Sequence, residues 1–309
     1  MRTSVTVGIA GLFLMPLAAC GGDSADTSAV TVVETTVEVV ANYPVTVGEL
    51  TLETQPQRIV SLSPTATEML YAIGAGDQVV AVDEYSNYPA EAVALGTKLS
   101  GFDPNVEAIA GFTPDLVVIT YDPGNLVDQL SALSIPVFMA PAATTFESVY
   151  QQIEQLGALT GHLDQAVQVS AQMQADIEAA VSGITMPAEP LSFYHELDNT
   201  LYSVTSKTFI GQVYALFGLR NIADGVEEGN DYPQLSAEVI VAADPDLMFL
   251  ASGETAAMVA ARDGWGSLTA ITSERIIELP ADIPSRWGPR LVQFVEVIRD
   301  AVSQLLASS

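Results

Sequence analysis

Six aromatic residues occupy segments predicted to follow buried strands, where their rings could contact a bound molecule. Flat apolar rings suit a large planar ligand or a metal chelate. Any one of them could be an ordinary loop residue with a packed ring, but six in segments predicted to converge favour a binding site. The six are Tyr85, Phe102, Tyr121, Tyr202, Tyr232 and Trp287.

Polar residues near these rings could bind the same molecule. His195 and Glu196 are adjacent in sequence and could coordinate a metal carried by the ligand, although a histidine satisfied at a strand end is more common. Arg286 is one of only ten basic residues, and its guanidinium can donate to amides, carboxylates or phosphates. Arg290 is expected to have a structural role, beside buried carbonyls or acids.

The chain lacks the common motifs of catalysis. It contains no G-x-S-x-G elbow, no H-E-x-x-H and no G-x-x-x-x-G-K phosphate loop. Its two histidines, His162 and His195, are too few for a histidine-rich zinc or manganese site. We therefore expect no enzymatic activity, no resident cofactor and no metal held directly by side chains.

Length and charge limit the remaining classes of protein. The chain has 309 residues, of which 49% are hydrophobic, and a formal net charge of −28. This length suits two α/β lobes, and the apolar fraction excludes a wholly disordered chain. So acidic a protein is a poor ligand for nucleic acid. The acidity itself favours solubility or salt adaptation rather than a specific function.

The N-terminus predicts export. Residues 1–19 have a positive start, an apolar core too short to span a bilayer and small residues at the end, as in a signal peptide. The sequence "LAAC" resembles a lipobox, so Cys20, the only cysteine, is expected to be acylated. A plain signal peptide with an incidental cysteine is the alternative. Residues 20–42 are expected to form a flexible tether.

Hydrophobic periodicity predicts the elements that position the candidate residues. A hairpin is expected around Gly48-Glu49, and a strand, helix and strand from Arg58 to Val82 predict a βαβ unit and a parallel sheet. The pattern returns after residue 190. Residues 164–181 contain no glycine or proline and predict a long helix. The predicted domains are an N-terminal lobe (43–160), a linker helix (161–186) and a C-terminal lobe (187–309).

A near-repeat supports two related lobes. The stretch "EAIAGFTPDLVVI" beginning at Glu107 is almost repeated as "EVIVAADPDLMFL" beginning at Glu238. Both copies predict a short helix, a Pro-Asp turn and a buried strand. A glutamate in the first turn favours the helix dipole, and that effect alone could account for both residues.

From Arg58 to Leu306 the chain resembles the substrate-binding proteins of ABC importers for cobalamin and ferric siderophores. The resemblance is carried by "RIVSLSPTATEMLYAIGAGDQVVAVDEYSNYP", "NVEAIAGFTPDLVVIT", "DYPQLSAEVIVAADPDLMFLA" and "SRWGPRLVQ". It implies the class III periplasmic-binding-protein fold, an α/β fold in which two Rossmann-like lobes with parallel central sheets are joined by a single long rigid helix. It also implies a ligand in the cleft between the lobes, beyond the carboxyl ends of the strands.

The resemblance also implies roles for individual residues. Glu107 and Glu238 are expected to dock against arginines of a two-fold symmetric permease. Ser285 departs from the pattern, because the cobalamin binder has an acid there, and the basic triad of tris-catecholate binders is not evident. A neutral or cationic ligand, such as a corrinoid or a hydroxamate-type ferric complex, is therefore favoured. The positions that match the family's pocket are Tyr85, Tyr202, Tyr232 and Arg286.

We therefore predict a monomeric solute-binding lipoprotein, anchored by lipid to the extracytoplasmic face of the cell membrane. It is expected to capture an iron-siderophore complex or cobalamin and to deliver it to an ABC permease homodimer with its ATPase. Two alternatives stay open. One is a surface protein that relays haem or another chelate without an importer, and the other is a metal-dependent or hydrolytic enzyme on the same fold.

Overall fold

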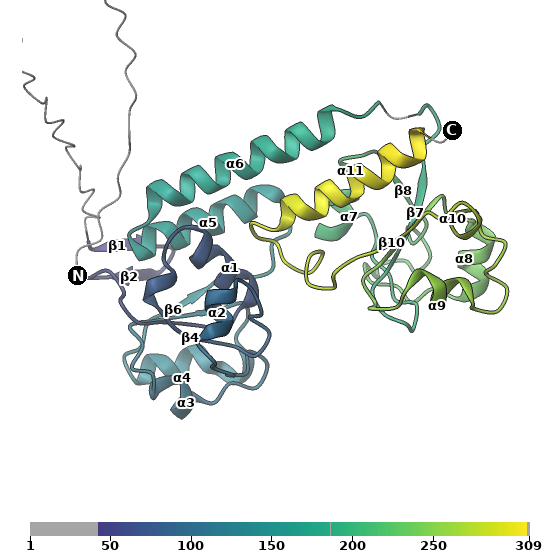
Figure 1. The fold of residues 1–309 in the computed structure, drawn as a ribbon. Helices are drawn as coiled ribbons and strands as arrows, with labels where there is room; N and C mark the ends of the chain where they lie inside the picture. Colours follow the sequence, from purple (N-terminus) through teal and green to yellow (C-terminus); the bar gives the residue numbers. More distant parts are fainter. Residues whose placement is uncertain (1–42, 186, 308–309) are drawn as a thin grey trace, which may run out of the picture. The chain divides into compact units, whose positions relative to one another are not determined.

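The structure, a computed structural model, describes residues 43–185 and 187–307. The predicted signal peptide, tether and lipidation site Cys20 lie outside the described residues. Within those residues, no helix has both the length and the apolar character needed to cross a bilayer. The described part contains two four-stranded parallel sheets (Figure 1), which confirms the predicted α/β class.

The first sheet has the strand order β4-β3-β5-β6, with every neighbouring pair parallel. All four side chains of β5 are buried, as expected for a central strand covered on both faces. Ser63 caps α1 by accepting a hydrogen bond from the Ala66 N–H, and Pro64 follows at the first position, as the sequence predicts. The strands are β3 (Ile59–Ser61), β4 (Val79–Val82), β5 (Leu116–Ile119) and β6 (Val137–Met139). The helices are α1 (Pro64–Ala72), η1 (Gly76–Gln78), α2 (Ala90–Ala94), α3 (Val106–Ala110), η2 (Pro123–Asn125) and α4 (Leu126–Ala132).

The second sheet has the order β10-β9-β7-β8 and is also parallel throughout. The predicted strand-helix-strand pattern after residue 190 is confirmed by β7, α7 and β8. The strands are β7 (Ser192–Glu196), β8 (Arg220–Asn221), β9 (Leu247–Leu250) and β10 (Ile276–Glu278). The helices are α7 (Phe209–Ala215), α8 (Ala237–Ala243), α9 (Ala256–Ala260) and α10 (Thr269–Thr272).

The hairpin predicted near the start of the folded part is also present. β1 (Val45–Val47) pairs antiparallel with β2 (Leu50–Leu52), and the turn between them needs a positive φ, which Gly48 supplies at 58°.

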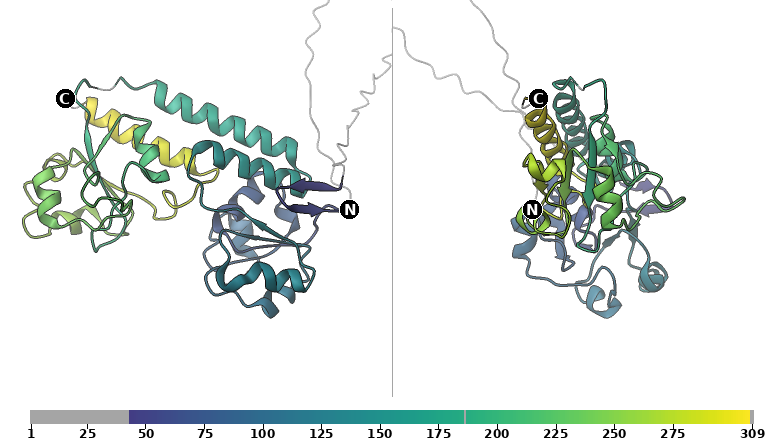
Figure 2. Two further views of the ribbon diagram at one scale, coloured as in Figure 1. Left: turned by 180° about the vertical axis from the view of Figure 1, so that it is seen from behind. Right: turned by 90° about the vertical axis from the view of Figure 1, so that its right-hand side faces the viewer.

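Two long helices, α5 (Phe146–Thr160) and α11 (Leu291–Ala307), lie alongside different parts of a third, α6 (Leu163–Ser182), next to the sheets (Figures 1 and 2). Helix α6 lies where the linker helix is predicted and leads from the first sheet toward the second. Helices α5 and α6 approach closely at Gly157. The position requires glycine, because a Cβ there would clash with the Cβ of Ala166.

One apolar cluster connects both sheets and the three long helices. Its members include Val118 of β5, Ile153 of α5, Met173 of α6, Phe249 of β9 and Phe294 of α11. Each sheet also has a smaller cluster of its own on its other face. Separating the two sheets would therefore expose apolar side chains to water, at roughly 25 cal/mol per Å².

The near-repeat forms the same unit in each sheet. Helix α3 leads through a Pro-Asp turn into β5, and α8 leads through the second Pro-Asp turn into β9. Asn105 and Ser236 cap the two helices by accepting hydrogen bonds from the N–H groups of Ala108 and Val239. The strands also have matching neighbours, because β5 lies beside β3 and β9 beside β7.

Candidate ligand-binding site

Three of the predicted aromatic residues form one exposed surface at the carboxyl end of the first sheet. Tyr85 follows β4, Tyr121 follows β5, and Phe102 lies in the loop before α3. The rings of Tyr85 and Phe102 meet edge to face at 5.5 Å, and those of Phe102 and Tyr121 lie 6.1 Å apart. The three residues are 51%, 67% and 43% exposed in the order Tyr85, Phe102, Tyr121. We call them the aromatic face.

A buried polar network holds the loop that carries Tyr85. The Asp83 carboxylate accepts hydrogen bonds from the Tyr85 N–H at 2.7 Å and from the Ser86 hydroxyl at 3.0 Å. The Ser86 hydroxyl also lies 2.9 Å from that of Thr67, which in turn donates to Ser61. Burial raises the pKa of Asp83, and these hydrogen bonds partly oppose the rise. The loop is therefore held in a defined shape by hydrogen bonds within the protein.

Arg286 joins the aromatic face from a distant part of the chain. It belongs to residues 279–290, which connect β10 to α11 and which we call the return segment. Its Nη2 donates to the carbonyl of Tyr85 at 3.3 Å and to Asp282 at 3.1 Å. Its Nε is buried without a hydrogen-bond partner among the described residues, and so is Nε1 of the neighbouring Trp287. Trp287 packs against the main apolar cluster.

Glu68 organises the return segment and was not singled out from the sequence. It is buried on α1 and accepts hydrogen bonds from Nε and Nη2 of Arg290 at 2.9 and 2.5 Å. The expectation that Arg290 pairs with a buried acid is thereby confirmed. These hydrogen bonds from the guanidinium raise the pKa of Arg290, which also lies 4.5 Å from the ring of Tyr88. The sequence did contain a signal that could have identified Glu68, because it is an acidic residue within the apolar run of a predicted buried helix.

Two further predicted residues lie at the carboxyl end of the second sheet. Tyr202 and Tyr232 are 40% and 51% exposed. They are carried by two segments that run antiparallel, with Tyr202 bridged to Gln234 and the Ser203 N–H donating to the carbonyl of Pro233. Both tyrosine side chains are therefore accessible to a ligand from solvent.

His195 and Glu196 do not lie on the surface, contrary to the prediction that they contact the ligand. Both are 0% exposed at the carboxyl end of β7. Glu196 accepts hydrogen bonds from both terminal nitrogens of Arg262 at 2.6 and 2.8 Å, and Arg262 also pairs with Glu254. Nδ1 of His195 lies 2.8 Å from the Tyr214 hydroxyl, and burial lowers the His195 pKa to about 3. Neither side chain is accessible to a ligand at the surface.

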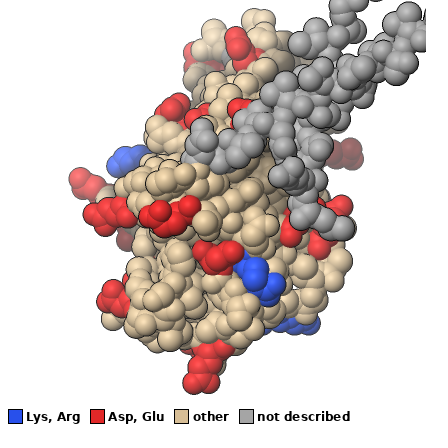
Figure 3. Space-filling model, turned by 90° about the vertical axis from the view of Figure 1, so that its left-hand side faces the viewer, with Lys and Arg blue, Asp and Glu red and all other residues tan. Residues whose placement is uncertain are grey.

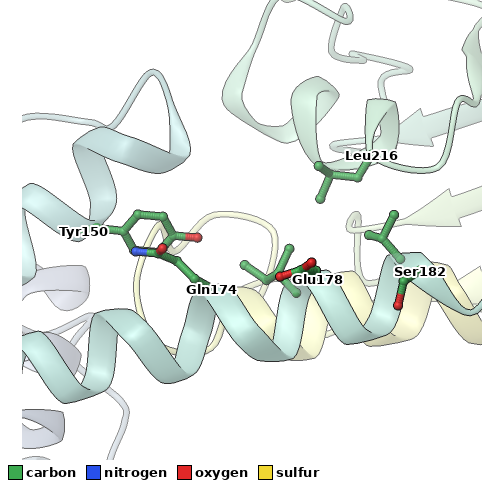
Figure 4. A pocket seen from close by; sticks show the side chains of 7 residues that line it. Tyr150, Gln174, Glu178, Ser182 and Leu216 are labelled. Atoms are coloured by element: carbon green, nitrogen blue, oxygen red, sulfur yellow. The ribbon is translucent and has the colours of Figure 1, made fainter.

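A hollow in the described chain lies away from all these residues (Figure 4). It measures about 330 Å³ and is mainly apolar. Its lining comes from α5, α6 and the residue after α7, and within the described chain it includes no residue of the predicted ligand set. Residues 43–185 and 187–307 also contain no group of three or more metal-ligating side chains. The residues that line the hollow are Tyr150, Gln174, Ile177, Glu178, Val181, Ser182 and Leu216.

Glu107 and Glu238 occupy equivalent exposed positions in the first turns of α3 and α8. Hydrogen bonds from its own backbone N–H and from Ser236 lower the pKa of Glu238, so this carboxylate stays charged at mildly acidic pH.

The comparison with protein families identifies the fold. The pattern of the family described as periplasmic binding protein matches residues 59–283. The chain belongs to this family.

Three relatives extend this result. A Bacillus subtilis protein, named as the uncharacterized ABC transporter substrate-binding lipoprotein YvrC, is 30% identical over 84% of this chain and 86% of its own. A Halobacterium salinarum protein, named cobalamin-binding protein, is 32% identical over 82% of this chain and 72% of its own. The crystal structure of the periplasmic vitamin B12 binding protein BtuF of Vibrio cholerae is 25% identical, with a TM-score of 0.66 over 81% of this chain and 98% of that one. The resemblance found in the sequence is confirmed for family and fold.

Proposed function

We propose that this protein is an extracytoplasmic solute-binding protein that captures a corrinoid and delivers it to an ABC permease. The observation that carries the proposal is the aromatic face, in which the exposed ring of Phe102 lies near both other rings and Arg286 donates to the backbone of Tyr85. Exposed apolar rings gathered at the carboxyl ends of parallel strands suit a large, flat ligand. The cobalamin-binding relative from Halobacterium salinarum and the vitamin B12 binder of Vibrio cholerae support a corrinoid as the first candidate. A hydroxamate-type ferric complex is the second.

The charges around the aromatic face favour a neutral or cationic ligand. Each of its rings is next in sequence to an exposed carboxylate, namely Glu84, Asp103 and Asp122. Arg286 is the cation nearby, and Asp282 already accepts one of its hydrogen bonds. The chain as a whole is also acidic, with a net charge of −28, and Figure 3 shows one side of the molecule on which carboxylates are spread widely and cations are few. A trianionic chelate would meet repulsion with little compensation.

Membrane attachment and permease docking complete the proposal. Cys20 would carry the lipid, which agrees with the lipoprotein named among the relatives. Glu107 and Glu238 would each meet a basic patch on one subunit of a homodimeric permease, because equivalent units of the two lobes carry them. Palmitate should enter the wild-type chain in cells, and a Cys20→Ala variant should not incorporate it.

A ligand panel tests the proposed binding. The whole chain, purified in detergent, is titrated with cyanocobalamin, haem, ferric hydroxamate and catecholate siderophores, and Zn²⁺, and both thermal stability and intrinsic fluorescence are followed. We expect cyanocobalamin to raise the melting temperature and to quench the fluorescence, since a ligand that binds only the folded state stabilises it. Stabilisation by the catecholate complex in preference to the others would contradict the charge argument. No response to any chelate would refute the proposal.

A further inference from the structure

The return segment starts at the end of β10, in the second sheet, but its polar contacts are with the first lobe. Asp282 accepts a hydrogen bond from Asn87 at 2.6 Å. Arg286 donates to the carbonyl of Tyr85, and Arg290 donates twice to Glu68. The predicted C-terminal lobe, residues 187–309, therefore contains a part that is fastened to the N-terminal lobe.

The backbone of the return segment is also close to α1. A Cβ added to Gly288 would lie 3.5 Å from Cγ2 of Thr65 and 3.8 Å from Cγ of Met69. Thr65 and Glu68 are three residues apart on α1, so they lie on one face of that helix. The segment thus packs on the same helical face that presents the Glu68 carboxylate.

Glu68 is the charge that holds two guanidinium groups together. Its side chain is 2% exposed, while those of Arg286 and Arg290 are 12% and 13% exposed. Arg290 pairs with Oε1 of Glu68 at 2.5 Å, and Nε of Arg286 lies 3.7 Å from the same oxygen. Without this carboxylate, two largely buried cations would face each other, and their negative neighbours would be Asp282, which forms an ion pair with Arg286, and the more distant charge of Asp83, which is a costly arrangement.

We propose that Glu68 is a positioning residue for ligand binding, which fastens the return segment to α1 and so holds Arg286 beside the aromatic face. This inference rests on the proposed function of that face. Because these contacts join the protein's own side chains and backbone, they can hold this side of the site without help from the ligand, which reduces the ordering cost of binding. Glu68 itself does not touch the ligand.

The experiment compares two buried arginine-glutamate pairs, one in each lobe. Glu68→Gln and Arg290→Gln break the pair that holds the return segment, and Arg290→Lys keeps the positive charge. Arg262→Gln is the matched control, because Arg262 pairs with the buried Glu196 in the other lobe. All variants carry Trp265→Phe, so that Trp287 is the only remaining tryptophan and its emission reports on the return segment.

The measurements are made on the whole chain in detergent, with cyanocobalamin as the probe. We expect Glu68→Gln and Arg290→Gln to shift Trp287 emission to longer wavelength without ligand and to weaken cyanocobalamin binding about tenfold. Arg290→Lys should recover part of both effects. Arg262→Gln should lower the melting temperature comparably, yet leave the emission and the affinity unchanged, which a general loss of stability would not do.

Other results would overturn the inference. Unchanged emission and unchanged affinity in Glu68→Gln would show that the carboxylate does not position the segment. An equal loss of affinity in Arg262→Gln would show that the weaker binding of the Glu68 and Arg290 variants results from a general loss of stability. If the parent protein bound none of the chelates, the proposed function would fail, whereas the fastening of the return segment would still be decided by the emission of Trp287.

Discussion

The carboxylate of Asp246 accepts hydrogen bonds from both the backbone N–H and the hydroxyl of Ser192, at 2.7 and 2.8 Å. Asp115 makes the equivalent contacts in the first sheet, accepting from the N–H groups of Gln57 and Arg58, both at 2.8 Å. Each is the aspartate of a repeated Pro-Asp turn. It ties the start of its own strand to the chain at the start of the neighbouring strand, which explains why the repeat keeps an aspartate there.

Asp246→Asn tests this link. One oxygen, Oδ2, accepts both hydrogen bonds from Ser192, so the amide oxygen of asparagine could still accept them but without the negative charge that strengthens them. We therefore expect the free energy of unfolding to fall by about 1–3 kcal/mol. Urea denaturation measures the change. Asp263→Asn, at an exposed position, is the control and should alter stability by less than about 0.5 kcal/mol. Equal effects of the two substitutions would argue against a structural role for the repeated aspartate.

Phe102→Ala should separate binding from stability. Phe102 is the most exposed ring of the aromatic face, so its truncation should change the melting temperature little while weakening cyanocobalamin binding about tenfold. Leu133→Ala removes a similarly exposed apolar side chain after α4 and should not affect binding. Calorimetric titration of both variants gives the comparison, and unaltered affinity in Phe102→Ala would exclude the aromatic face as the ligand surface.

His195 should make the protein less stable in mild acid. Burial holds its pKa at about 3 in the folded state, below the value of about 6.5 in an unfolded chain. The unfolded state therefore binds a proton first, and stability is lost as pH falls from about 6.5 toward 3. The loss attributable to this group between pH 7 and pH 5 is about 2 kcal/mol. Urea denaturation at both values should show a smaller loss in His195→Gln than in the wild type, and parallel losses would contradict the prediction.

Charge reversal of Glu107 and Glu238 should abolish delivery without affecting capture. Both side chains are exposed, so the double substitution to arginine should leave the fold and the affinity for cyanocobalamin intact while uptake through the cognate permease is lost. Glu53→Arg combined with Glu274→Arg, also at exposed positions, controls for the change in net charge. Uptake at the wild-type rate in the Glu107/Glu238 variant would exclude these residues from docking.

The excess of carboxylates should make stability depend on salt. With a net charge of −28, repulsion between exposed acids opposes the compact state, and salt screens it because the Debye length falls from about 10 Å at 0.1 M to about 3 Å at 1 M. The melting temperature should therefore rise over this range of KCl. Substituting several exposed acids by their amides should flatten the rise, and an equally steep rise in that variant would point to general salting-out instead.

The sequence predicted the elements well because local signals determine them. The capping Ser63 with Pro64, Gly48 in the hairpin turn, and the helix over residues 164–181 are all found where expected. Parallel topology follows from the alternation of strands and helices. The aromatic rings were predicted as one set, and the structure brings Tyr85, Phe102 and Tyr121 into contact.

The errors arose where tertiary contacts override local pattern. His195 and Glu196 end a strand, as sites in this fold class often do, but nothing local reveals that Arg262 covers the glutamate. Glu68 was overlooked because its partner is Arg290, far along the chain. Long-range pairs of this kind leave no periodic signal in a single sequence.

One apolar cluster contains buried side chains from both sheets, so unfolding of one lobe would expose apolar side chains of the other. Heating should therefore give one cooperative transition, and a ligand bound at the far end of either sheet should protect backbone amides throughout the molecule. A binding protein of this kind keeps its two lobes in a nearly constant arrangement and so acts as a rigid template for the solute. Its selectivity would come from the match between template and solute, and release of a tightly held solute would need outside force, which a transporter driven by nucleotide hydrolysis can supply.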